Sequence, residues 1–180
     1  MKSFPIIQQK SNPIGLDLFL LHINQGLSAL TYTDKQNNEK NWFSNLFGLS
    51  EKNPKDDVPV IQYNDKNYFS VQPDQDFKSI AFYYENNARA STDELNGYEA
   101  DLSLVVWFNR NKYDVDFNVK EHFINAVLNY FANNRQTIEV NSIFANKADV
   151  FSNYTITAFQ PLDIPFGGFR ITFNGTYSIC

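Results

Sequence analysis

The chain has 180 residues, enough for one domain with a substantial core and too few for two comfortable domains. Hydrophobic residues make up 43% and charged residues 19%, a composition typical of folded rather than disordered proteins. The net charge of −5 is spread along the chain without a basic block, so we expect no sequence-independent nucleic-acid binding. Cys180 is the single cysteine, which excludes a disulfide framework within the chain and a cysteine-based metal cluster.

Aromatic residues are abundant, at 16% with 17 Phe and 10 Tyr. Phe and Tyr fit both pleated sheets and protein interfaces, so two interpretations stay open: extra contact surface, or an aromatic core and nothing more. The chain starts without the continuous apolar run of a signal peptide, and no window approaches 18 apolar residues. We therefore expect a soluble protein with no membrane partner.

The first predicted element is a helix over about residues 12–30. Asn12 and Pro13 are typical of a helix start, with Pro at the first helical position. Gly26 weakens this helix by about 1 kcal/mol relative to alanine, so packing has to hold it. The apolar stripe that would do so recurs at intervals of four and three and comprises Leu16, Leu20, Ile23, Leu27 and Leu30.

Three further elements follow a polar stretch. Residues 42–49 (WFSNLFGL) predict a short helix that ends at Gly48 and serves either as a core plug or as a contact with another chain. Residues 58–63 and 67–71 predict a β-hairpin, because turn residues separate two apolar runs. Residues 77–84 predict a third strand. The strands of this half of the chain are expected over about 58–110.

A long strand over 98–110 is expected to form the centre of the fold, after a polar loop over 85–97. Its apolar residues alternate on one face, as in a strand with one buried side. The other face begins with polar residues but ends with Val105 and Trp107. An apolar end on a polar face indicates that something covers it, either a helix or a neighbouring subunit.

The second helix is predicted over about 118–134. Asn118 as N-cap with Glu121 three residues later matches a capping box. C-terminal strands are expected over about 138–178, including 154–159, with a bend before the last strand. The pair Gly167-Gly168 suggests a β-bulge there.

The predicted fold class is α+β, a single domain over residues 1–180. Helix, strands, helix and strands follow one another, with connections too short for a doubly wound parallel fold. We therefore expect an antiparallel sheet with two main helices packed on one face.

The sequence contains few candidate catalytic residues. The histidines, His22 and His122, both fall in predicted helices without a second ligand at metal-binding spacing. The chain has no nucleophile elbow, P-loop or H-E-x-x-H motif, and its paired aspartates lack the rest of a calcium loop. We expect a protein that is not an enzyme, with no cofactor and no metal. A dispersed catalytic set stays open as an alternative.

The order of elements resembles the tail-terminator and tail-completion proteins of tailed bacteriophages. The resemblance rests on the leucine-striped helix 12–30, DVPVIQY at 57–63, YEADLSLVVWFNR at 98–110 and FGGFRITFNGTY at 166–177. In that family an early strand often reads L-P-A-I-x-V-Y, and a central meander occupies the place of the long strand. The chain departs from the family in WFSNLFGL and ENNARASTDELNG, which suit a connector ring in a podovirus-like neck, such as that of crAss-like phages.

This resemblance implies a tail-terminator-like fold and a structural virion protein. Such a protein forms a ring of six or twelve subunits in the neck or tail, joins portal to tail, and encloses the DNA channel. Its partners would be further copies of the chain and the portal, adaptor and tail proteins, with DNA only passing through non-specifically. It would be assembled in the host cytoplasm.

A ring needs two different surface patches that meet each other. The candidate subunit-interface residues are Trp42, Phe43, Phe47, Tyr83, Arg89, Trp107, Phe166 and Arg170. The alternative is a non-catalytic ligand-binding module, for example one that binds carbohydrate through exposed rings of Trp107, Tyr83 and Tyr113.

Overall fold

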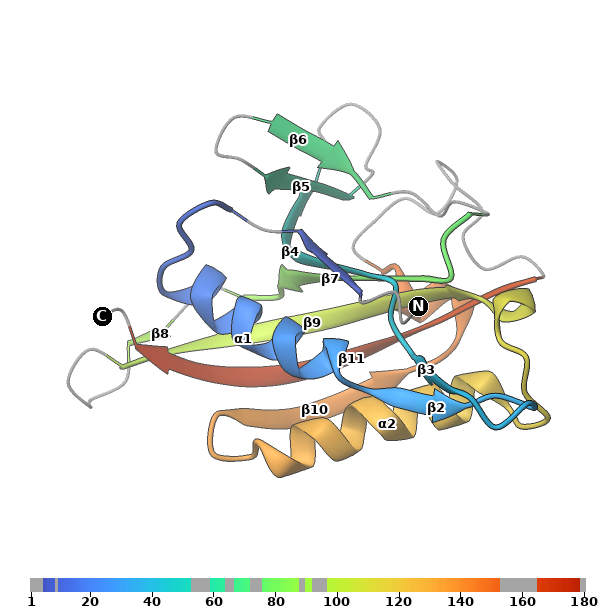
Figure 1. The fold of residues 1–180 in the computed structure, drawn as a ribbon. Helices are drawn as coiled ribbons and strands as arrows, with labels where there is room; N and C mark the ends of the chain where they lie inside the picture. Colours follow the sequence, from blue (N-terminus) through green and yellow to red (C-terminus); the bar gives the residue numbers. More distant parts are fainter. Residues whose placement is uncertain are drawn as a thin grey trace.

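A computed structural model of the chain describes residues 5–8, 10–52, 59–63, 67–71, 76–87, 90–91, 97–152 and 165–178. It shows a mixed α+β fold with a large sheet, which confirms the predicted α+β class (Figure 1). The helices are α1 (Leu16–Ser28), α2 (Val119–Asn133) and α3 (Lys147–Val150), with a 3-10 turn at Arg110–Lys112. The strands are β1 (Ile6–Gln8), β2 (Thr31–Thr33), β3 (Glu39–Asn41), β4 (Asn45–Lys52), β5 (Pro59–Tyr63), β6 (Asn67–Ser70), β7 (Ser79–Glu85), β8 (Ala90–Ser91), β9 (Gly97–Asn109), β10 (Ile138–Phe144) and β11 (Phe166–Ser178).

The main sheet has the order β10-β11-β9-β7-β4-β5-β6, with β1 added at β4 and β8 at β9, while β2 and β3 form a separate ribbon. The prediction of an antiparallel sheet is wrong at β4, which runs parallel to both β1 and β7. The reason is that residues 42–49 do not form the predicted helix. The strand β4 begins at Asn45, with Leu46 buried on one face and Phe47 on the other. A strand buried on both faces does not alternate.

The central part of the sheet follows the sequence pattern. Strand β9 lies between β7 and β11 and pairs antiparallel with both. Its alternating apolar residues face one core, as predicted. The expected bulge at Gly167-Gly168 is wrong, because both residues pair in regular register with Phe108 and Trp107. At Gly167 a side chain would come within 2.7 Å of the Phe108 ring, so close packing explains the glycine.

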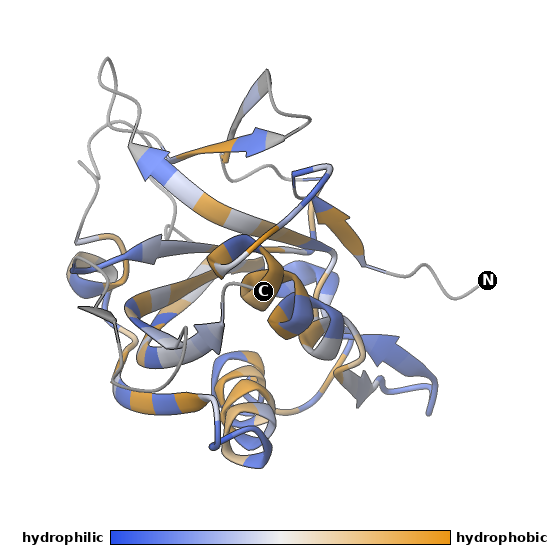
Figure 2. Ribbon diagram, turned by 90° about the vertical axis from the view of Figure 1, so that its left-hand side faces the viewer, coloured by the Kyte–Doolittle hydropathy of each residue, from blue (hydrophilic) through white to orange (hydrophobic). Residues whose placement is uncertain are grey.

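Both main helices pack on the same face of the sheet (Figure 1). Apolar residues concentrate where the helices meet the strands (Figure 2). Helix α1 starts three residues later than Pro13, because its N-cap is Gly15, with a left-handed φ of 53° that glycine tolerates. The predicted N-cap of α2 is confirmed: the side-chain oxygen of Asn118 accepts from the backbone N–H groups of Lys120 (3.2 Å) and Glu121 (3.5 Å).

The opposite face of the sheet carries a second core. Val105 and Trp107 are buried there together with residues of β4 and β7. The chain itself covers this face, with Val150 and Phe151 at the end of α3 and Ile61 in β5. The sequence left open whether a helix or a neighbouring subunit covers Trp107. In the structure, residues of the same chain cover it.

Three more predicted elements lie within the described residues. The hairpin is confirmed as β5 and β6, the strand over 77–84 as β7, and the first C-terminal strand as β10. The predicted strand 154–159 and most of the loop 85–97 lie outside the described residues. None of the helices in the described part of the chain has the length and apolar character needed to cross a bilayer.

Candidate functional site

The structure buries most of the predicted interface residues inside the chain. Six of the eight are buried, and Tyr83 and Trp107 show only 0% and 2% of their surface. The six are Trp42, Phe43, Phe47, Tyr83, Trp107 and Arg170. Phe166 is half-buried with its ring 4.7 Å from that of Trp107, and Arg89 lies outside the described residues. These six side chains therefore expose at most 8% of their surface to a second chain.

The aromatic residues proposed for carbohydrate binding are also buried. Tyr83 and Trp107 belong to the two cores, and Tyr113 is 6% exposed. Tyr113 donates its hydroxyl hydrogen to the backbone oxygen of Trp42 at 2.8 Å. The Trp42 ring stacks on Phe123 at 4.8 Å. The aromatic excess of the sequence is therefore used largely for packing.

Strand β10 is the last of the described strands at one end of the sheet and is exposed along most of its length. It pairs with β11 on one side, and no described strand pairs with its outer side. Val140 and Ile143 are large apolar residues of β10 and are 36% and 44% exposed. An exposed edge with apolar side chains is a ready template for another chain.

The backbone at Val140 faces outward. The N–H of Thr176 donates to the oxygen of Thr137 at 2.9 Å, and the register runs regularly from there to Val140. Antiparallel pairs alternate between hydrogen-bonded and non-hydrogen-bonded positions, so Val140 is at a non-hydrogen-bonded one. Its own N–H and C=O then point away from β11. A register shift between Val140 and Ser142 interrupts the ladder beyond this point.

A hollow of about 540 Å³ lies between α2 and β10, beside this edge. Its lining is mainly apolar, with one arginine and one glutamate: Leu128, Phe131, Ala132, Arg135, Ile138, Glu139 and Val140. The edge strand and the hollow together form a surface that we call the β10 edge.

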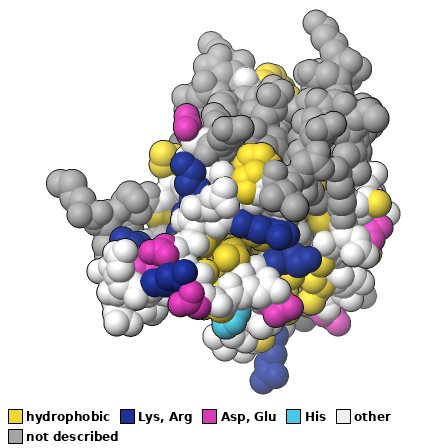
Figure 3. Space-filling view, turned by 90° about the vertical axis from the view of Figure 1, so that its right-hand side faces the viewer, with side chains coloured by type: hydrophobic (Ala, Val, Ile, Leu, Met, Phe, Trp, Pro, Cys, Tyr) yellow, Lys and Arg dark blue, Asp and Glu magenta, His cyan; other side chains and the backbone are white. Residues whose placement is uncertain are grey.

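A larger groove of about 860 Å³ lies where the β2–β3 ribbon meets the starts of β4 and β7. We call it the hairpin groove, after the β2–β3 ribbon. Its lining residues include Tyr32, Lys40, Phe43, Lys78 and Asp114. Basic and acidic side chains gather around an apolar patch on this side of the molecule (Figure 3).

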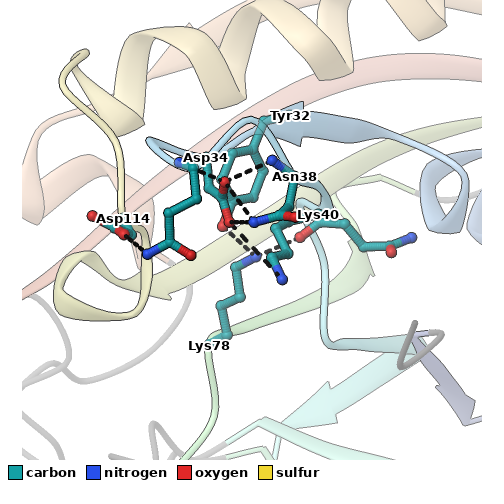
Figure 4. A network of polar contacts seen from close by, with 8 residues as sticks. Tyr32, Asp34, Asn38, Lys40, Lys78 and Asp114 are labelled. Carbon is teal, nitrogen blue, oxygen red and sulfur yellow. Dashed lines mark hydrogen bonds and ion pairs between the residues drawn. The ribbon is translucent and has the colours of Figure 1, made fainter. Parts of the chain in front are cut away.

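The ribbon beside the groove is shaped by Asp34. Its side-chain oxygen accepts from the backbone N–H groups of Gln36 (2.9 Å) and Asn38 (2.8 Å), which closes the turn (Figure 4). Asn37 takes a left-handed φ of 61° there. The hydrogen bond from the Asn38 backbone, opposed in part by burial, lowers the pKa of Asp34.

Lys78 reaches across the groove from the residue before β7 (Figure 4). Its Nζ donates to the Tyr32 hydroxyl at 2.9 Å and to the backbone oxygen of Asn41 at 2.5 Å. The same nitrogen lies 4.3 Å from the centre of the Tyr32 ring and 4.4 Å from that of Tyr113. Lys78 thus joins three segments that are far apart in sequence.

Burial controls the ionisation of these groups. It lowers the pKa of Lys78 to about 7, with a further contribution from the positive charge of Lys40. Burial also raises the pKa of Tyr32 to about 12, assisted by Asp34 and Asp114, so this phenol stays neutral near pH 7. The two oxygen acceptors and the two ring faces favour the ammonium form of Lys78, which opposes the effect of burial.

The sequence alone does not distinguish Lys78 from the other lysines. No local motif marks it, and its partners at positions 32, 41 and 113 are brought together only by the fold. In the described residues, no group of three or more His, Cys, Asp or Glu side chains is placed to hold a metal ion. Comparison with protein-family models, curated proteins and solved structures finds no match for the chain.

Proposed function

We propose that this chain is a structural virion protein that assembles into a ring in the neck or tail of a tailed bacteriophage. The β10 edge is the observation that carries the proposal. It combines a strand whose outer side pairs with no described strand, the exposed apolar residues Val140 and Ile143, and an adjoining hollow. Its role is assembly rather than catalysis.

The shape of the sheet supports a ring. Among the described strands, the order ends in β10 on one side and β6 on the other, so these two ends are different surfaces. A contact between two different patches is heterologous, and repeated contacts of this kind close into a ring if the rotation allows. Tyr68 of β6 is 58% exposed and offers an apolar contact at the second end.

The sequence resemblance indicates where in the virion this ring would lie. A tail-terminator or head–tail connector of this kind sits between portal and tail with six or twelve subunits. Its neighbours are portal, adaptor and tail proteins, and DNA passes through its lumen without specific contacts. The tail-terminator-like arrangement of the fold belongs to this proposal, and so does its place in the virion.

The contribution of the β10 edge is tested by two matched variants. Ile143→Lys places a charge on the exposed edge, and Ile14→Lys makes the same change at a 69% exposed isoleucine before α1. Sedimentation velocity should show assembly lost in Ile143→Lys and kept in Ile14→Lys, because a buried unpaired charge opposes edge contact. Full assembly of a folded Ile143→Lys variant would remove the β10 edge from the proposal.

A further inference from the structure

The amine of Lys78 lacks the carboxylate partner that three other described lysines have. Lys10, Lys35 and Lys40 each have a carboxylate within 4.0 Å. Among the described residues, none supplies such a partner to Lys78, and the charge that acts on it most is that of Lys40. No described carboxylate therefore lies within ion-pair distance of the Lys78 nitrogen to hold its proton.

The hydrogen bonds of Lys78 leave one direction of the nitrogen unused. A neutral amine has two N–H groups and one lone pair. The Tyr32 hydroxyl and the Asn41 backbone oxygen can take both N–H groups. With both N–H groups donated, the lone pair is free to attack an electrophile; where the Tyr32 hydroxyl donates to the neutral amine instead, the electrophile has to displace that hydrogen bond.

The surroundings also suit the product of such a reaction. An imine formed at Nζ can take up a proton and become an iminium cation. The faces of the Tyr32 and Tyr113 rings, which lie 4.3 Å and 4.4 Å from Nζ, stabilise a cation at this position. The backbone oxygen of Asn41 can accept from the remaining N–H.

The groove gives a small molecule access to this nitrogen. Lys78 is one of its lining residues, and the volume of about 860 Å³ exceeds what a small carbonyl compound needs. The ionisable groups that line the groove around Lys78 are Tyr32 on β2, Asp34 in the turn, Glu39 and Lys40 on β3, Asp76 before β7, and Lys112 and Asp114 before α2.

We propose that Lys78 is a covalent modification site whose amine condenses with a small aldehyde or ketone in the hairpin groove. The nitrogen lone pair attacks the carbonyl carbon, and the carbonyl oxygen takes up a proton to give a carbinolamine. Loss of that hydroxyl as water leaves a carbon–nitrogen double bond. One amine and one carbonyl compound thus give one imine and one water, without oxidant or reductant.

The test treats the wild-type protein with propanal and sodium cyanoborohydride at pH 7 and follows each lysine by peptide mass spectrometry. The reductant traps the imine as a stable secondary amine. Lys35 and Lys40 serve as controls in the same ribbon, with 45% and 51% of their side chains exposed. Lys78 should react about tenfold faster than either, although it is less exposed, because more of its amine is unprotonated. An equal or slower rate at Lys78 overturns the proposal.

Two further measurements test whether the groove, and not the local sequence, makes Lys78 reactive. The rate at Lys78 should be half-maximal near pH 7, whereas the rate at Lys40 should still increase through pH 9. In denaturant the three lysines should react at similar rates, because the groove is gone. A preference for Lys78 that persists in the unfolded chain would assign its reactivity to local sequence and contradict a site formed by the fold.

Discussion

The hydroxyl of Tyr83 donates a hydrogen bond to the side-chain oxygen of Asn24 at 2.9 Å inside the core. The amide nitrogen of Asn24 donates in turn to the backbone oxygen of Phe47 at 3.0 Å. Asn24 and Tyr83 are 1% and 0% exposed. This network ties α1 to β4 and β7, the two strands whose parallel pairing the sequence did not predict. A buried polar network specifies one arrangement when its members find their partners.

We expect Asn24→Leu to lower the free energy of unfolding by roughly 2–4 kcal/mol, because two buried polar groups lose their partner. Tyr83→Phe is the control, since it removes one hydroxyl and leaves the Phe47 contact; it should cost only about 1 kcal/mol. Urea denaturation of both variants measures the difference. Equal costs would mean that the Asn24–Phe47 hydrogen bond contributes little.

Gly26 in α1 packs against the ring of Tyr130 in α2, and a methyl group at this position would overlap that ring. Gly26→Ala should therefore destabilise the protein by about 1 kcal/mol, although alanine favours a helix. In a Tyr130→Ala background the overlap is gone, and the same change should stabilise by about 1 kcal/mol. Thermal denaturation of the four proteins tests this change of sign. A loss of stability in both backgrounds would contradict the role of Tyr130.

The pKa of Lys78 makes stability depend on pH. Unfolding restores this pKa from about 7 to its ordinary value of 10.5, so the unfolded chain binds more protons between these values. The free energy of unfolding should therefore increase with pH in this window. Between pH 7.5 and 9.5 the wild type should gain about 2 kcal/mol more than Lys78→Met.

Chemical denaturation at several pH values measures that difference. The buried tyrosines have raised pKa values, and their effect on stability begins only near pH 10, above this range. Parallel stability curves for wild type and Lys78→Met would show that Lys78 does not titrate in the expected window.

The elements that the sequence predicted well are those whose own residues carry a clear periodic pattern. The alternation in β9 and the capped, striped helix α2 are local patterns, and each is found near its expected position. Residues 42–49 gave a wrong prediction because Leu46 and Phe47 are buried on opposite faces, which hides the period of a strand. The pairing of β4 with β7 depends on residues far apart in sequence.

The candidate functional residues were harder to predict, for a related reason. Aromatic side chains such as Trp42 and Trp107 suggested contact surfaces, but the fold uses them to fill two cores. The exposed apolar residues Val140 and Ile143 lie in a short strand whose position at the sheet edge no local pattern reveals. Lys78 acquires its environment only when β2, β3 and the segment before α2 meet around it.

Assembly into a ring is best measured by the native mass of the purified protein over a range of concentrations. Native mass spectrometry should find a closed species of six or twelve subunits, with few intermediate sizes, because a heterologous contact that closes satisfies every subunit. A protein that stays monomeric at high concentration, alone and with portal and tail proteins added, would contradict assembly into a ring.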